Sequence, residues 1–146
     1  MSSDHIFSIA VGVVAGLAIF LFLVVGLAHA REAGVSVIDG DTLKQNGKTY
    51  RIHGIDAPEL SQTCPDGWPA GRMALTRLLE ITNGKQVICQ DRDRDRYGRV
   101  VAVCWASGED IGARLVRDGL AWAFLRYSAD YAPQEAKAKA DRLGIH

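Results

Sequence analysis

The sequence lacks a net charge, and this excludes proteins that hold nucleic acid by bulk electrostatic attraction. Its 146 residues include 17 Lys and Arg and 17 Asp and Glu. One of the acids, Asp4, lies among the first 30 residues, so the remaining chain carries 17 bases against 16 acids. A chain so close to neutrality does not attract a polyanion over long distances. Any recognition of phosphate must therefore come from a few local side chains.

Charged residues are also absent from residues 6–28, an apolar run with the roughly 20 residues that a helix needs to cross a bilayer. Two interpretations of residues 1–30 stay open. A cleavable signal peptide fits the small residues Ala28 and Ala30, whereas a single transmembrane anchor fits the length of the run. We therefore expect a hydrophobic helix ahead of a folded domain at 33–146. The protein would be exported (periplasmic or secreted), or anchored in the membrane through residues 6–28 if the segment stays.

Cysteines are few and odd in number, so at least one of them is unpaired within the chain. Cys89 and Cys104 lie on two predicted strands, at similar distances from the tip of the hairpin between them. A disulfide between them and two buried free thiols are both compatible with this placement.

The first half of the folded part combines short predicted strands with one well-defined helix. Apolar residues at helical spacing, followed by Asn83-Gly84, predict a helix over residues 70–82. Before it, strands are predicted over 34–38, 42–45 and 48–55. The pair Asn46-Gly47 between the last two is a strong hairpin signal. Prolines make residues 56–69 a loop.

The second half continues with two strands and two helices. The predicted elements are strands over 85–90 and 99–105 with a charged linker between them, a short helix over 111–118, an extended or irregular stretch over 120–127, and a last helix over 133–143. Asp110 can cap the short helix and Gly119 can end it. Three strands, a helix and two strands predict a five-stranded antiparallel sheet closed into a barrel of the OB type. The expected fold class is mainly β with α (α+β), with about three helices.

Three segments carry the residue types that hydrolysis of a phosphodiester requires. Charge on the phosphate must be neutralised, a water must be deprotonated, and the reacting group must be held in line. Asp39 and Asp41 lie on a turn between strands, in the segment 37–42. The segment 51–59 begins with Arg51 on a strand and supplies two carboxylates on the loop that follows. The segment 95–99 is a hairpin tip with a further arginine.

In this order and spacing the three segments resemble the staphylococcal-nuclease-like (thermonuclease) family, over about residues 34–145. The resemblance implies a Ca²⁺ ion on Asp41, Asp56 and the backbone carbonyl of Ala57. It implies Glu59 as general base, and Arg51 and Arg99 as the groups that bind the phosphate and stabilise the transition state. Carboxylate and carbonyl oxygens suit Ca²⁺, and the guanidinium fork suits phosphate better than an ammonium does.

The resemblance also implies contacts to the nucleotide from Tyr97 and Tyr127, although packing on the barrel is the alternative for both. His53 is expected to be a strand-surface residue, because the family motif does not use its position. Exported relatives often carry a cysteine where this chain has Ala70, which implies that Cys64 is unpaired. His146 stands where the family commonly has Trp.

The function that the resemblance implies is a Ca²⁺-dependent endonuclease. Its substrate would be DNA and/or RNA, cut with little sequence specificity and with release of the 5′-oxygen, and no obligate protein partner is inferred. The alternative is a catalytically silent OB-fold module, tethered to the membrane, that binds nucleic acid or protein. The presence of all five acidic and basic side chains favours the enzyme. A scaffold that only binds Ca²⁺ would leave both arginines unexplained.

Overall fold

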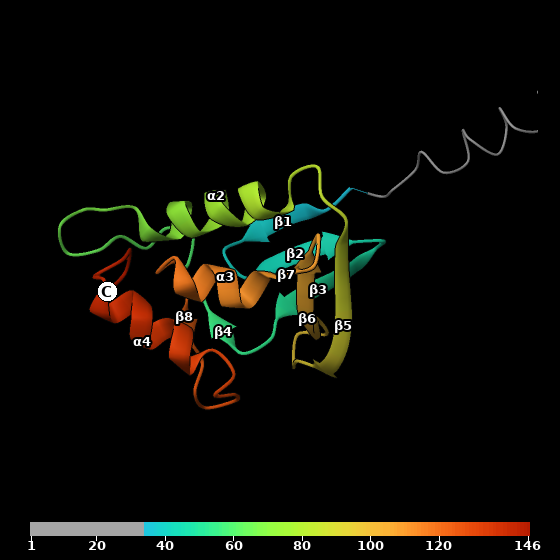
Figure 1. Ribbon diagram of the computed structural model, residues 1–146. Coiled ribbons are helices and arrows are strands. Elements are labelled where there is room, and N and C mark those ends of the chain that lie inside the picture. The colour runs from blue at the N-terminus through green and yellow to red at the C-terminus, as the bar shows by residue number, and fades with distance from the viewer. Residues whose placement is uncertain (1–33) are drawn as a thin grey trace, which may run out of the picture. The chain divides into compact units, whose positions relative to one another are not determined.

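Residues 34–146 are described by a computed structural model, in which helices pack against a mixed sheet (Figure 1). The predicted hydrophobic helix, with its two interpretations, lies outside these residues. Within them, no helix is long and apolar enough to cross a membrane.

The main sheet has six strands in the order β1-β2-β3-β6-β5, with β7 paired to β6. The bounds are β1 Ser36–Asp39, β2 Thr42–Gln45, β3 Lys48–Ile52, β5 Val87–Arg94, β6 Val100–Ala106 and β7 Glu109–Asp110. A second sheet consists of two short strands, β4 Ile55–Asp56 and β8 Trp122–Ala123. The first three strands and the β5–β6 hairpin agree in order with the OB-type prediction.

Two features of the predicted barrel are wrong. β3 and β6 pair in parallel, with Arg51 opposite Val101, because the chain crosses over through a helix before the β5–β6 hairpin returns beside β3. The sheet is also open: β1 and β5 are its outer strands, and no pairing joins them in the described part of the chain. Both features depend on contacts between distant segments, which hydrophobic periodicity does not encode. The fold is therefore α+β and OB-like in strand order, but not a closed antiparallel barrel.

Strand boundaries differ from the prediction at two places that later matter for the site. The predicted strand over 48–55 is broken after Ile52, because Gly54 adopts a φ of +72°, which favours glycine. β5 continues to Arg94, so the first residues of the predicted charged linker belong to a strand. Because of the break, Asp56 lies on the separate short strand β4. The longer β5 lengthens the hairpin whose tip precedes Arg99.

The helices follow their local signals closely. α2 spans Ala70–Thr82 as predicted, and the backbone N–H of Asn83 closes it with a hydrogen bond of 2.8 Å to the Leu79 carbonyl. α3 spans Ile111–Arg117, and Asp110 caps it by accepting a hydrogen bond from the Ala113 N–H. α4 spans Ala132–Ala140, shorter than the predicted 133–143 at its end. In Figure 1, α3 lies between α2 and α4, and α2 runs beside β1.

The core joins the inner face of the sheet to these helices. Its largest fully buried side chains include Leu43 and Ile52 from the strands and Leu78, Ile111 and Leu115 from the helices. Burying each such side chain contributes about 1.5–3 kcal/mol to the free energy of unfolding. Of the two cysteine alternatives the structure has the disulfide: Cys89 and Cys104 are directly opposite in the hairpin and bonded. Cys64 is a free, partly exposed thiol, as expected.

Candidate active site

The three predicted segments converge on one pocket of about 450 Å³. Its lining residues are Asp39, Gly40, Asp41, Arg51, Asp56, Ala57, Pro58, Glu59, Tyr97 and Arg99. These come from the β1–β2 turn, from β3 and the loop after it, and from the tip of the β5–β6 hairpin. Seven of the eight residues predicted to act as catalytic, metal-binding or substrate-binding groups therefore line one pocket, although up to 58 residues separate them along the chain, from Asp41 to Arg99.

Asp41 is the buried acid of the pocket, with its side chain 10% exposed. The Asp41 backbone N–H donates to the Asp39 carboxylate at 3.1 Å, which fixes the tight β1–β2 turn. The Asp41 carboxylate accepts hydrogen bonds from the Ala57 N–H at 2.9 Å and from the Thr42 hydroxyl at 3.1 Å. Burial raises the pKa of the Asp41 carboxyl to about 6, although Arg51 and the Ala57 N–H act to lower it.

Arg51 spans the two carboxylates that were predicted as metal ligands. Its Nη1 lies 2.7 Å from Asp41 Oδ2 and its Nη2 lies 2.9 Å from Asp56 Oδ1. The Arg51 side chain is 15% exposed, whereas that of Asp56 is 51% exposed. The guanidinium thus holds one acid at the base of the pocket and the other at its rim.

The same contacts test whether the pocket suits a hard cation. Because one guanidinium reaches Asp41 and Asp56 at once, the two carboxylates are close enough to face a single ion. Within residues 34–146, however, no three Asp, Glu, His or Cys side chains gather closely enough to hold an ion by themselves. The donor set therefore fits a Ca²⁺ that takes its remaining oxygens from a backbone carbonyl, water and substrate.

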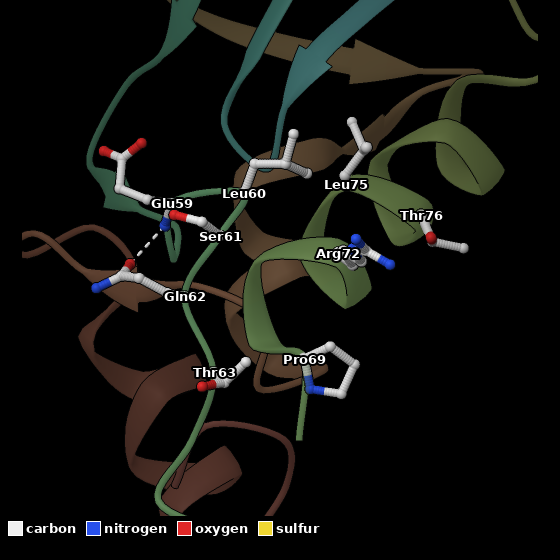
Figure 2. Close-up of a pocket in the computed structure, with 9 residues that line it drawn as sticks. All are labelled: Glu59, Leu60, Ser61, Gln62, Thr63, Pro69, Arg72, Leu75 and Thr76. Atoms are coloured by element: carbon white, nitrogen blue, oxygen red, sulfur yellow. Dashed lines mark hydrogen bonds between the residues drawn. The ribbon is translucent and has the colours of Figure 1, made fainter. Parts of the chain in front are cut away.

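Glu59 also lines the pocket, on the loop that follows Pro58. The residue is exposed, and its backbone N–H donates to the side-chain oxygen of Gln62, which holds the start of the loop. Figure 2 shows the Glu59 carboxylate directed away from α2 and from the side chains of that helix. A carboxylate that is exposed and anchored through its own backbone can accept a proton from a water in the pocket.

Arg99 is held in place by Asp95, four residues before it. The Arg99 Nε donates to Asp95 Oδ2 at 2.7 Å, and the N–H groups of Tyr97 and Arg99 both donate to Asp95 Oδ1. Burial alone would raise the pKa of Asp95, but these hydrogen bonds and the Arg99 charge lower it below its usual value. The Arg99 Nη1 also donates to the Thr42 hydroxyl at 3.2 Å.

Sequence reasoning missed Asp95 and Thr42. Asp95 was part of an alternating run of Arg and Asp that is typical of a solvated hairpin tip. Its turn position before Tyr97-Gly98 was the available signal for a structural role. Thr42 links the two halves of the site, because its hydroxyl donates to Asp41 and accepts from Arg99. Nothing in the local sequence distinguishes that threonine from any other strand residue.

The two predicted substrate-binding tyrosines differ in position. Tyr97 lines the pocket, and the Arg99 guanidinium lies 5.7 Å from the centre of its ring. Tyr127 does not line the pocket: its side chain is 69% exposed, and its ring packs edge-on against Phe124. His53 lies on the turn after β3 and outside the pocket, where its Nε2 is 3.8 Å from Asp130.

Known proteins resemble this chain over most of its length. The family described as staphylococcal nuclease homologue matches residues 49–146. A micrococcal nuclease of Shigella flexneri is 31% identical to it, and the match covers 93% of this chain and 84% of that protein. The endonuclease YncB of Bacillus subtilis is 35% identical over 74% of this chain and 57% of its own length. An uncharacterised 38.1 kDa protein of Capnoides sempervirens is 34% identical, but this chain spans only 33% of its length.

The family match covers the pocket residues from Arg51 to Arg99. The resemblance seen in the sequence is confirmed, and so, at the level of the family, is the prediction of a phosphodiester hydrolase of the nuclease type. The chain belongs to the staphylococcal nuclease homologue family.

Proposed function

We propose that this chain is a Ca²⁺-dependent endonuclease that hydrolyses phosphodiester bonds of DNA and/or RNA with little sequence specificity. The observation that carries the proposal is the convergence of two arginines, two aspartates and Glu59 on one pocket. Family membership supports the reaction type. The micrococcal nuclease and the endonuclease among the relatives support nucleic acid as the substrate.

Each side chain has a role that its position allows. Glu59 takes a proton from a water, whose oxygen then attacks the phosphorus. Arg51 and Arg99 bind the phosphate oxygens and offset the negative charge that grows as the fifth oxygen approaches. The bond from phosphorus to the 5′-oxygen breaks, and that oxygen keeps the electron pair and takes up a proton from solvent. Asp41, Asp56 and the Ala57 carbonyl would hold Ca²⁺, which supplies further positive charge at the phosphate when bound.

The test is digestion of plasmid and heat-denatured DNA by the full-length chain, with Ca²⁺ or with a chelator. Digestion that the chelator abolishes is the expected result. Retention of DNA without digestion would contradict the enzyme and support the silent binding module.

A substitution tests the assignment of the base. Glu59→Gln removes the group that accepts the proton but keeps the shape of the side chain, so we expect kcat to fall at least about 100-fold. Glu80→Gln is the matched control, because Glu80 lies on α2 and pairs only with Arg77 in the described residues. An undiminished rate in Glu59→Gln would show that another group is the base.

We also propose that residues 1–30 direct the protein out of the cytoplasm or anchor it in a membrane. Their apolar run is the support for this proposal. Mass spectrometry of the mature N-terminus separates the two cases. A chain that begins after residue 30 was cleaved, whereas an intact N-terminus in the membrane fraction shows an anchor. An intact chain found only in the soluble cytoplasmic fraction would contradict both.

A further inference from the structure

Two further hollows adjoin the candidate active site, and each shares different lining residues with it. A groove of about 780 Å³ lies between α2 and the loop 59–63, and it shares Glu59 with the pocket. A smaller hollow of about 320 Å³ lies beside the β5–β6 hairpin, and it shares Tyr97 and Arg99 with the pocket. We call them the α2 groove and the hairpin hollow. The pocket with its five predicted side chains therefore lies between two adjacent spaces that the proposed reaction does not itself use.

The hairpin hollow has the charge of an anion site. Its lining includes three cations, Lys48, Arg94 and Arg99, and no carboxylate. Arg94 is exposed, and among residues 34–146 it forms no ion pair. Lys48 lies 3.6 Å from Asp91, but both side chains are about half exposed, and such surface pairs contribute little. Arg99 is paired with Asp95, and Arg94 Nη1 donates only a long hydrogen bond of 3.5 Å to the Gly98 carbonyl. A phosphate that enters the hollow therefore meets one cation, Arg94, that no carboxylate in the described residues neutralises.

The α2 groove combines apolar walls with one available cation. Leu60 on the loop is 47% exposed, and Leu75 on α2 is partly exposed on the other side of the groove (Figure 2). Arg72, also on α2, is exposed and pairs with no carboxylate in the described part of the chain. Apolar side chains can pack against the face of a base, and a guanidinium suits the phosphate beside it.

The groove is also held in shape before anything binds. The Gly71 N–H donates to the Gln62 carbonyl at 3.1 Å, and the Gln62 side chain accepts from the Glu59 N–H. A Cβ on Gly71 would lie 1.9 Å from the Glu59 carbonyl oxygen, so the loop and the helix are in direct backbone contact. The wall that carries Leu60 therefore does not have to form when a ligand arrives.

We propose that the substrate strand crosses all three spaces, with Arg94 and Arg72 as phosphate-binding residues on opposite sides of the scissile phosphate. The inference rests on the proposed function. An enzyme that cuts within a chain must hold nucleotides on both sides of the bond it breaks. Near-neutral net charge leaves such local cations as the means of holding them. The expected ligand is an unpaired stretch of DNA or RNA at least three nucleotides long.

The experiment measures binding without cleavage. Full-length protein carrying Glu59→Gln is titrated into a fluorescein-labelled 12-nucleotide oligothymidylate in Ca²⁺, and fluorescence anisotropy gives the Kd at several salt concentrations. Adding Arg94→Gln or Arg72→Gln should each weaken binding about fivefold and reduce the slope of log Kd against log salt by about 0.7. Arg94→Lys and Arg72→Lys keep the charge and should restore most of the slope.

The control is Arg142→Gln, the same chemical change at an exposed arginine after α4 that lines none of the three spaces. The proposal is overturned if Arg94→Gln and Arg72→Gln bind like this control. It is also overturned if only one of them matters, because the strand would then extend to one side alone. If both variants bind more weakly, but the unsubstituted protein digests no DNA, the strand path is supported and the proposed function fails. If neither variant changes binding, but the unsubstituted protein does digest DNA, the strand path fails and the proposed function is supported.

Discussion

At the scale of single residues, Arg51 makes contacts that no other cation could make together. Its two terminal nitrogens reach separate carboxylates, on Asp41 and Asp56, and Nη1 also lies 3.4 Å from the Ile52 carbonyl. A guanidinium is planar and divides its donors between two directions, whereas an ammonium is a point charge. The residue therefore fixes the relative position of both aspartates, in addition to the phosphate contact that we propose for it.

Replacing Arg51 by Lys should consequently damage catalysis although the charge is kept. We expect kcat/KM to fall about 100-fold, the usual effect of losing one well-placed donor to a transition state. Steady-state kinetics on single-stranded DNA give the value. Arg114→Lys is the control, since Arg114 pairs with Glu109 and Asp118 away from the pocket. A rate like that of the control would remove Arg51 from the reaction.

Asp95 acts through another residue, because it contacts Arg99 and lies outside the pocket lining. In Asp95→Asn the side-chain oxygen can still accept from the backbone, but the charged contact to the Arg99 Nε is lost. We expect kcat to fall about tenfold to a hundredfold with KM changed less, because a small displacement of Arg99 weakens transition-state binding most. Asp93→Asn on the same hairpin should leave kcat unchanged, because the Asp93 side chain accepts a hydrogen bond from the Arg94 backbone N–H, which an amide oxygen can also accept, and does not contact Arg99. Equal kcat values in the two variants would contradict the positioning role.

At the scale of secondary-structure elements, α2 and the loop before it form one unit that positions Glu59. Gly71 is the second residue of α2, and its Cα lies against the backbone of Glu59 and Leu60. A larger residue there would push the loop away, and with it the carboxylate at the edge of the pocket.

Gly71→Ala should therefore lower both stability and activity. Alanine raises helix propensity by up to about 1 kcal/mol over glycine, which by itself would stabilise α2. The contact with the Glu59 carbonyl outweighs this gain, since both partners are backbone and cannot turn aside, and we expect a net loss of about 1–3 kcal/mol. Denaturant unfolding and kcat are the measurements. Gly34→Ala, at a glycine whose Cβ would meet nothing within 4 Å, is the control. A stability equal to that control would show that the loop yields without strain.

Elements that depend on local signals were predicted from the sequence more accurately than elements that depend on tertiary contacts. The helix over 70–82 was predicted with its correct ends, because its apolar spacing and the Asn83-Gly84 stop are local features. The break at Gly54 was missed, because residues on both sides of it continue the pattern of a strand. The parallel β3–β6 pairing could not be predicted from periodicity, since it joins segments about 50 residues apart.

At the scale of the whole molecule, the buried Asp41 couples the pocket to the stability of the fold. Burial raises its folded pKa from 3.8 to about 6, so folding favours the protonated form. The corresponding stabilisation is fully present below the unfolded pKa and is lost as the pH rises through about 6. The rise in pKa corresponds to at most about 3 kcal/mol.

We therefore expect the free energy of unfolding of the chelator-treated protein to fall between about pH 4 and pH 7, relative to Asp41→Asn. Burial lowers the pKa of His146, so this residue makes the free energy of unfolding rise with pH. That contribution is the same in both proteins and cancels in the comparison. Adding Ca²⁺ above pH 6 should restore stability to the original chain alone, because the ion replaces the proton on the carboxylate. Parallel curves for the two proteins, or an equal effect of Ca²⁺ on both, would contradict this account of Asp41.

The sequence by itself indicated which side chains line the pocket, because Asp41, Arg51, Asp56, Glu59 and Arg99 occur in a recognisable order and spacing. It also determined the helices, whose hydrogen bonds and caps are local. Only the tertiary structure decided that Arg51 spans both aspartates, that Asp95 holds Arg99, and that two further hollows adjoin the pocket. These features depend on distances between segments far apart in the chain. Such distances are set by the strand order of the sheet and the packing of α2 on it, neither of which a local pattern contains.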